Sequence, residues 1–434
     1  MRKKILLIAL VTFSTRAFFA VTYEGPVYYK ALSEAFPAVA DNIIAGKGLV
    51  VKVDVASIAS PNSQWEYLPP IDHPLGYLFF MFVPYWLFSF IGVQIFQALI
   101  AALSAILLYR IALKVFSPPT AFLSAMLYAC WPLSARFDVV VLPDAAVSFF
   151  LILGTWLIIR SQESRWSWLY WALAGLSFGI GMLMRADVML LPFFVIAAFF
   201  IFKTARPKAR WSLLLLAGIG IAILPNAMWN YEATGGSVVP LGIGNGISLW
   251  EGISQFGDTL GTVYGDMKMT EREGYRSWAY PDGVARDRAR FKEAIGIILQ
   301  HPVWYAGVML KRIPVLLRPD GIIASKFMPA PKEFFSANPD AGMPQYFARY
   351  PFGALIQFLL IALQGISLVL AAIAAAIRWR DPLVLLPITI VLYYFFIHLG
   401  TNAEPRYFYP AIPFVLLLAS DTLVALNSRL RKAR

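Results

Sequence analysis

Long apolar runs separated by short polar connections dominate the pattern of this sequence. Ten of these runs are long enough, or nearly so, to cross about 30 Å of hydrocarbon as helices. They cover residues 5–22, 93–115, 118–138, 144–160, 167–184, 188–202, 211–229, 352–377, 382–399 and 408–426. The pattern therefore predicts an all-α, polytopic membrane bundle of about ten spanning helices.

The composition agrees with this prediction and excludes several other classes of protein. Hydrophobic residues make up 59% of the 434 residues and charged residues only 14%, which is too little polar surface to cover a soluble core. The single cysteine, Cys130, excludes an internal disulfide, and the three histidines lie too far apart for zinc-type spacing. The sequence implies no cofactor and no metal site, although its many carboxylates are compatible with a divalent ion.

Lysine and arginine lie in short tracts at the ends of the apolar runs, and these tracts predict the orientation of the chain. If the basic N-terminus, residues 2–4, is cytoplasmic, all six basic tracts fall on the cytoplasmic side. This distribution explains the net charge of +12 better than nucleic-acid binding does. The first run contains Arg16 and lacks a small-residue cleavage site, so we interpret it as a retained helix rather than a signal peptide. We expect an integral inner (plasma) membrane protein with both chain ends in the cytoplasm.

Two further apolar segments are predicted to lie along the outer membrane interface. Residues 75–92 are apolar enough to span, but a crossing there would place the later basic tracts outside. Residues 302–318 carry two cations in mid-segment, where a charge in hydrocarbon costs about 2.5–3.5 kcal/mol. We therefore expect a single domain, residues 1–434, with its polar chemistry in outer-face loops at 23–92 and 230–350.

The first outer loop carries two candidate catalytic carboxylates. Residues 33–51 predict a helix that ends at Gly46 and Gly48, with Glu34 in its first turn. Glu34 is either a favourable charge at a helix N-terminus or a general base. Glu24, directly after the first apolar run, is either a solvated loop carboxylate or the base itself.

Other polar residues in the outer loops are candidates for binding. Asp72 and His73 precede the 75–92 segment, and they form either a hydrogen-bonded structural pair or part of a binding site. Asn230 precedes a glycine-rich stretch, residues 241–252, whose backbone NH groups are suited to a compact loop.

Ionisable residues also recur where the apolar runs reach the outer face. They are Asp144, Arg185 with Asp187, and Glu404 with Arg406. Charges at such positions are costly unless they are paired or functional, and Asp144 and Arg185 could simply neutralise each other. With the carboxylates of the first loop, they suit a reaction on a lipid phosphate, in which arginine binds the phosphate and a carboxylate activates an acceptor hydroxyl.

Seven local patterns occur together in one order along the chain. They are Arg16 in the first run, the stretch from Ala40 to Gly48, the run Asp72-His73-Pro74-Leu75-Gly76, Asp144, LMRADVMLLP, PNAMWNYEATGGSVVPLGIGNGISLWEG, and EPRYFYPAIPFVLLLA. In these patterns the chain resembles the GT-C glycosyltransferases, of the protein O-mannosyltransferase and lipid A aminoarabinose transferase type. The chain departs from the family in two respects: Leu32 and Ser33 stand where it has Asp or Asp-Glu, and Trp229 replaces an arginine.

The resemblance implies a GT-C bundle that acts as an inverting glycosyltransferase on the periplasmic or extracytoplasmic side. The donor would be a polyprenyl-phosphate sugar, and the acceptor a glycan, a glycolipid or a protein. The implied site has Glu34 or Glu24 as base, Asp144 assisting, and Arg185, Arg406, His73, Asp72, Asn230 and Tyr407 binding substrate. The alternatives are a transporter or flippase for a lipid-linked or anionic substrate, and a non-catalytic scaffold. The polar groups are concentrated on the outer side, and the sequence shows no internal repeat of two halves such as many transporters have. Both observations favour the enzyme.

Overall fold

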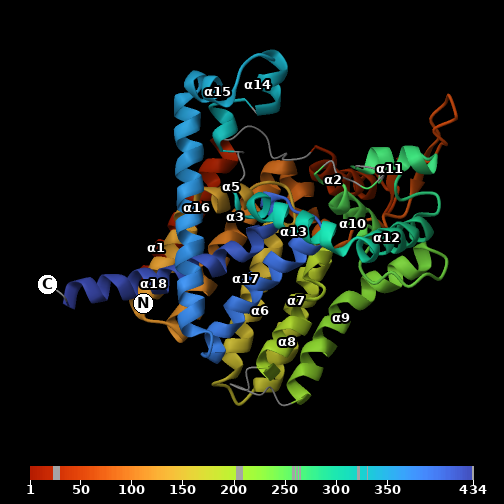
Figure 1. The fold of residues 1–434 in the computed structure, drawn as a ribbon. Coiled ribbons are helices and arrows are strands. Elements are labelled where there is room, and N and C mark those ends of the chain that lie inside the picture. The colour runs from red at the N-terminus through yellow and green to blue at the C-terminus, as the bar shows by residue number, and fades with distance from the viewer. Residues whose placement is uncertain are drawn as a thin grey trace.

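The fold is a helical membrane bundle with a smaller, mostly helical cap (Figure 1). The computed structural model describes residues 1–22, 30–201, 209–256, 260, 262, 265–319, 323–329 and 331–432. Within these residues, eight helical segments are long and apolar enough to cross a membrane. They are α1 (Arg2–Thr22), α3 (Gly76–Val115), α6 (Asp144–Ser161), α7 (Ser167–Met184), α9 (Ala209–Ala233), α16 (Pro351–Arg378), α17 (Pro382–Gly400), and η3 (Pro405–Ala411) together with α18 (Ile412–Lys432).

Two of the ten predicted spans are not single long helices. The predicted span 118–138 is split into α4 (Pro118–Cys130) and α5 (Pro132–Phe137), because the residue before Pro132 takes an extended conformation. The predicted span 188–202 becomes the short turn η1 (Ala186–Val188) and the 11-residue helix α8 (Leu191–Ile201). All-helical membrane architecture is thus confirmed, with fewer long helices than the hydropathy pattern suggested.

Inside α3 the backbone breaks four residues before the boundary predicted between residues 75–92 and the span 93–115. Its backbone leaves the helical conformation at Phe88 and at Ser89, where φ is 54°. Pro84 lies one turn earlier and lacks the NH group that would continue the helical hydrogen bonds. The segment before the break is therefore a separate arm, and its position at the membrane interface stays a prediction.

The two outer loops predicted from sequence pack against each other to form the cap. The first contains α2 (Lys30–Ile44) and an antiparallel hairpin of β1 (Val51–Asp54) and β2 (Trp65–Leu68), in which Val51 pairs with Leu68. The second contains α10 (Asn245–Ile253), α11 (Gly265–Glu273), α12 (Gly283–Gln300), α13 (Pro302–Leu317), η2 (Ala324–Lys326), α14 (Pro331–Ala337) and α15 (Met343–Arg349). Backbone hydrogen bonds join the loops, from Ile243 N to Ile71 O at 2.9 Å and from Arg276 N to Ala56 O at 3.2 Å.

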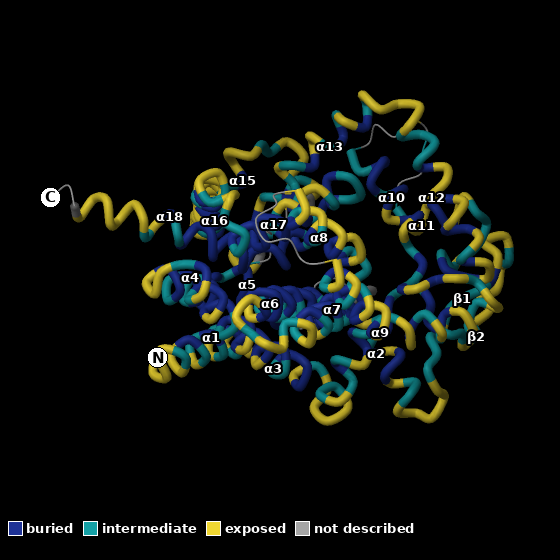
Figure 2. The backbone as a smooth tube through the Cα atoms, turned by 90° about the horizontal axis from the view of Figure 1, so that it is seen from below, coloured by how far each residue is buried: buried dark blue, intermediate teal, exposed yellow. Residues whose placement is uncertain are grey.

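Burial varies sharply among the long helices. In the most apolar window of α6, 72% of residues are buried, against 28% in α16, so α6 lies in the core and α16 at the periphery (Figure 2). Both chain ends lie on the left in Figure 1, whereas α10 to α12 lie at the right-hand edge.

A buried ion pair ties the first helix to the last spanning segment. Arg16 Nη2 lies 2.9 Å from Asp138 Oδ2, and both side chains are almost fully buried. The same carboxylate accepts hydrogen bonds from the hydroxyls of Tyr128 and Tyr409. The arginine that the resemblance placed in the first span therefore serves here to hold α1, α4, α5 and η3 together.

Candidate active site

Tyr407 in η3 is the centre of a cluster of ionisable side chains from distant parts of the chain. The guanidinium carbons of Arg185 and Arg406 lie 5.1 and 5.0 Å from the centre of its ring, within the range of cation–π attraction. His398, near the end of α17, stacks on the same ring at 4.9 Å. Arg185 stands at the extended end of α7, so three segments converge on one aromatic ring.

Each arginine of this cluster is paired with a carboxylate. Arg185 Nη1 lies 2.5 Å from Asp144 Oδ1, and its Nη2 lies 2.9 Å from Asp187 Oδ2. Arg406 Nε donates to Glu404 Oε2 at 2.7 Å. The Asp144 side chain is 1% exposed and that of Arg185 14%, so the pair is screened from bulk water. Asp144 is also the first residue of α6, where a negative charge is favoured by the helix dipole.

The electrostatics keep Arg185 charged. Burial alone would lower the pKa of its guanidinium, but the charges of Asp187 and Asp144 outweigh burial and raise it. Asp187 is shared with His398, whose Nε2 lies 3.4 Å from Asp187 Oδ2. The neutralisation of Asp144 by Arg185 that sequence allowed is therefore present. It also fixes the direction in which the guanidinium points.

The other predicted site residues lie outside this cluster. His73 Nε2 lies 4.0 Å from Asp72 Oδ2, and both side chains are partly exposed. The centre of the His73 ring lies 5.9 Å from that of Phe36 and 6.4 Å from that of Trp278. Asn230 is buried, and its amide donates to the carbonyls of residues 239 and 241, a contact that shapes the loop after α9.

The two candidate bases are placed differently. Glu34 is exposed on α2, and its carboxylate forms no ion pair or hydrogen bond with any described residue. Glu24 lies outside the described residues.

Two ionisable residues of the cluster were missed by sequence reasoning. His398 is a lone ionisable group in an apolar span, a signal that by itself marks a functional candidate. Glu251 is the only acidic residue of α10. Burial and the neighbouring carboxylates of Asp266 and Glu404 raise the pKa of Glu251 to about 9, with Arg406 opposing them.

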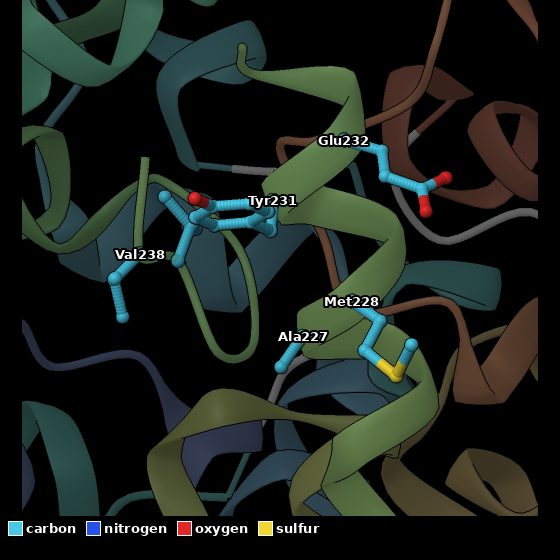
Figure 3. Close-up of a pocket in the computed structure, with 6 residues that line it drawn as sticks. Ala227, Met228, Tyr231, Glu232 and Val238 are labelled. Atoms are coloured by element: carbon cyan, nitrogen blue, oxygen red, sulfur yellow. The ribbon is translucent and has the colours of Figure 1, made fainter. Parts of the chain in front are cut away.

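A small pocket lies apart from the cluster, at the C-terminal end of α9. It measures about 250 Å³ and is lined by Ala227, Met228, Tyr231, Glu232, Val238 and Val239. The Tyr231 ring lies beside Val238 in it (Figure 3). No residue of the Tyr407 cluster lines this pocket. Within the described part of the chain, no three His, Cys, Asp or Glu side chains are arranged to hold a metal ion.

Comparison with known proteins bears on both the sequence and the fold. Residues 72–229 match the sequence model described as dolichyl-phosphate-mannose-protein mannosyltransferase. The matched segment contains Asp144 and Arg185 but ends before Glu251, His398 and Arg406. No curated protein matches the chain at a significant level.

Solved structures give a likeness over the whole chain. The archaeal oligosaccharyltransferase AglB from Archaeoglobus fulgidus, in complex with an inhibitory peptide and a dolichol-phosphate, matches with a TM-score of 0.53 and 12% identity over 100% of this chain. The same enzyme tethered to an acceptor peptide matches with a TM-score of 0.50 and 12% identity over 99% of this chain. ArnT from Cupriavidus metallidurans bound to undecaprenyl phosphate matches with a TM-score of 0.41 and 12% identity, over 96% of this chain and 76% of the ArnT chain.

This chain spans about half the length of the oligosaccharyltransferase structures, which it covers to 51% and 50%. At this identity the likeness shows the fold. The predicted resemblance is confirmed: the chain is a multi-pass membrane protein with the GT-C glycosyltransferase fold, and its residues 72–229 are similar to the dolichyl-phosphate-mannose-protein mannosyltransferase family.

Proposed function

We propose that this protein is an inverting glycosyltransferase, which moves a sugar from a polyprenyl-phosphate carrier to an acceptor hydroxyl at the outer membrane face. The observation that carries the proposal is the convergence of Arg185 and Arg406 on the Tyr407 ring. Two buried guanidinium groups, held by carboxylates at the ends of apolar helices, suit a phosphate that stays attached to lipid.

In the proposed reaction the two arginines bind the phosphate of the donor. The bond between the anomeric carbon and the phosphate oxygen breaks, and its electron pair stays on that oxygen. Negative charge on the departing polyprenyl phosphate therefore rises, and donors fixed in advance stabilise it most effectively. Asp144 assists by holding the Arg185 guanidinium at 2.5 Å, and Glu404 does the same for Arg406 at 2.7 Å.

The acceptor hydroxyl attacks the anomeric carbon from the opposite face, which inverts its configuration, and its proton passes to a carboxylate. Glu34 and Glu24 are both kept as the proposed base. The contact that supports Glu34 is between α2 and α3, because Phe36 of α2 packs on Tyr77 of α3 at 5.2 Å.

The similarities are consistent with this proposal. The matched family is described by transfer of mannose from dolichyl phosphate to protein, and the oligosaccharyltransferase structure was solved with a dolichol-phosphate. For this chain we propose a polyprenyl-phosphate sugar as donor and a glycan, glycolipid or protein as acceptor. The remaining proposed substrate contacts are Asp72 and His73, which are partly exposed, and Asn230, which is buried in α9.

The test is turnover of labelled polyprenyl-phosphate sugars by the purified full-length protein in lipid nanodiscs. Arg185→Met and Arg406→Met should each lower kcat by about 10²–10³-fold, as loss of one oxyanion contact does. Arg288→Met, at an exposed position of α12, is the matched control and should retain activity. Glu34→Gln or Glu24→Gln should lower kcat by about 10²–10⁴-fold if that residue is the base, with Glu66→Gln as control.

Slow release of free sugar from the donor, without any acceptor, would already favour the enzyme over a transporter. A protein that binds the donor but never consumes it would contradict the proposal. Full turnover in both arginine variants would refute the assignment of these residues to the phosphate.

A further inference from the structure

Arg312 of α13 is a fully buried cation that pairs with no carboxylate of the described residues. Its side chain is 0% exposed, and its hydrogen bonds go to carbonyl, amide and hydroxyl oxygens, which carry only partial charge. A buried charge without an opposite charge is costly unless such dipoles stabilise it. The groups around this guanidinium therefore identify the part of the chain that it holds in place.

The first group of dipoles belongs to the C-terminal end of α17. Arg312 Nη1 donates hydrogen bonds to the carbonyl of Leu399 and, at 3.2 Å, to the hydroxyl of Tyr305. That hydroxyl donates in turn to the carbonyl of Gly400 at 2.5 Å. The last carbonyls of a helix lack partners within it and carry partial negative charge, so a cation is favoured there. Arg312 thus stabilises the end of α17.

The same guanidinium orients the side chain of Gln255, which follows α10. Arg312 Nε donates to Gln255 Oε1 at 3.2 Å, and because arginine has no acceptor, this contact fixes which end of the amide is oxygen. Gln255 Nε2 donates to the carbonyl of Ala403 at 2.6 Å, and its Oε1 accepts from Ala403 N at 3.4 Å. A Cβ at Gly252 would lie 1.7 Å from the Thr401 carbonyl oxygen, so α10 also contacts this loop through its backbone.

We propose that Arg312 is a positioning residue of the donor site, which acts through Gln255 and residues 399–403 to hold Arg406 where the lipid phosphate binds. The inference rests on the proposed function, in which Arg406 binds that phosphate. Ala403 immediately precedes Glu404, whose carboxylate accepts from Arg406 Nε at 2.7 Å. Helix α13 also packs against η3, which contains Arg406.

The expected consequence of losing Arg312 follows from these contacts. The carbonyl of Leu399 and the amide of Gln255 would lose their donor, and residues 399–403 could then shift. Glu404 and Arg406 follow this loop directly in the chain and would shift with it. A phosphate-binding group is most effective when it is held in place before the substrate arrives, because ordering it then adds no further cost to binding.

The experiment is a double-mutant cycle on equilibrium binding of a short-chain polyprenyl phosphate to the full-length protein in nanodiscs. Arg312→Met should weaken binding by about 5–30-fold, although its side chain does not touch the ligand. Gln255→Leu leaves Arg312 with its other partners and should weaken binding by about 3–10-fold. Lys311→Met, at the exposed neighbouring position of α13, is the matched control and should bind as the unaltered protein does.

The second arm of the cycle distinguishes positioning from general damage to the fold. If Arg312 and Gln255 act through Arg406, replacing either should change affinity by less than about twofold once Arg406 is already methionine. In an Arg185→Met background most of the loss should remain, because residues 399–403 lead to Arg406 and not to Arg185. Thermal unfolding shows which variants are folded, and if Arg312→Met is not, Gln255→Leu decides.

Two outcomes would overturn the inference. Equal losses with and without Arg406 would mean that these residues stabilise the fold as a whole. Unchanged affinity in folded Arg312→Met or in Gln255→Leu would mean that the loop needs no such support. Failure of the proposed function gives a different result, since Arg406→Met alone would then bind the lipid phosphate as tightly as the unaltered protein, or neither protein would bind it.

Discussion

Removing the charge of Asp138 tests what holds the first and last spanning segments together. In Asp138→Asn, the Arg16 guanidinium keeps its charge but loses its partner, while both side chains remain 0% and 1% exposed. Breaking a buried ion pair in this way costs about 3–5 kcal/mol. The amide keeps one acceptor oxygen, so it can still accept a hydrogen bond from one of the two hydroxyls that reach the two carboxylate oxygens, those of Tyr128 and Tyr409. The expected loss therefore comes mainly from the unpaired cation, with a smaller part from the second hydroxyl.

The magnitude for the pair follows from a double-mutant cycle. Arg16→Met alone should also destabilise the bundle by about 3–5 kcal/mol, because it leaves the Asp138 carboxylate buried. The double variant has no buried charge left, and it should lose at most about 3 kcal/mol, for the hydrogen bonds and packing that are not replaced. The coupling energy between the two positions is therefore expected to be at least about 3 kcal/mol.

The assay is unfolding of the four proteins in mixed detergent micelles with increasing dodecyl sulfate, followed by tryptophan fluorescence. If the two single losses simply add, to within about 0.5 kcal/mol, the ion pair is not the source of stability and the reasoning is wrong. Because Tyr409 lies three residues after Arg406 in η3, Asp138→Asn should also weaken binding of the lipid phosphate.

Two further predictions concern the cap and its side of the membrane. Gly252→Ala places a methyl group 1.7 Å from the Thr401 carbonyl oxygen, and should destabilise the protein by about 1–3 kcal/mol and weaken lipid phosphate binding, measured by thermal unfolding and binding. A Cβ at Gly296 in α12 would have nothing within 4 Å, so Gly296→Ala should be neutral or stabilising by up to about 1 kcal/mol. Equal Tm losses in the two variants would contradict a direct contact between the backbones of α10 and Thr401. With Cys130 replaced by serine, Asn62→Cys should react with a membrane-impermeant maleimide in intact cells, and Gln162→Cys only after permeabilisation. The reverse pattern would place the cap in the cytoplasm and rule out the proposed orientation.

The sequence predicted the long helices well, because each must satisfy its own backbone hydrogen bonds in hydrocarbon and be apolar along its length. It also marked Asp144, Arg185 and Arg406, since charges at the ends of apolar runs are rare enough to be informative. The break at Trp131 and Pro132 was not predicted, because hydropathy summed over a window of residues does not detect one residue in an extended conformation.

Partners across long stretches of chain could not be predicted. Asp138 follows Arg16 by 122 positions, and neither local pattern indicates the other. Glu251 was missed for a related reason: α10 is amphipathic and short, so its carboxylate resembles an ordinary solvated charge until Asp266 and Glu404 are placed beside it. The choice between Glu24 and Glu34 stays a prediction.

The two halves of the Tyr407 cluster have a consequence for biogenesis. Asp144, Arg185 and Asp187 leave the ribosome long before His398, Glu404, Arg406 and Tyr407, because a long stretch of chain separates the two groups. The early half would wait in the translocon or the bilayer with its ionic groups only partly partnered. The two arginines proposed to bind the donor phosphate therefore come together only after the final hydrophobic segment has been inserted.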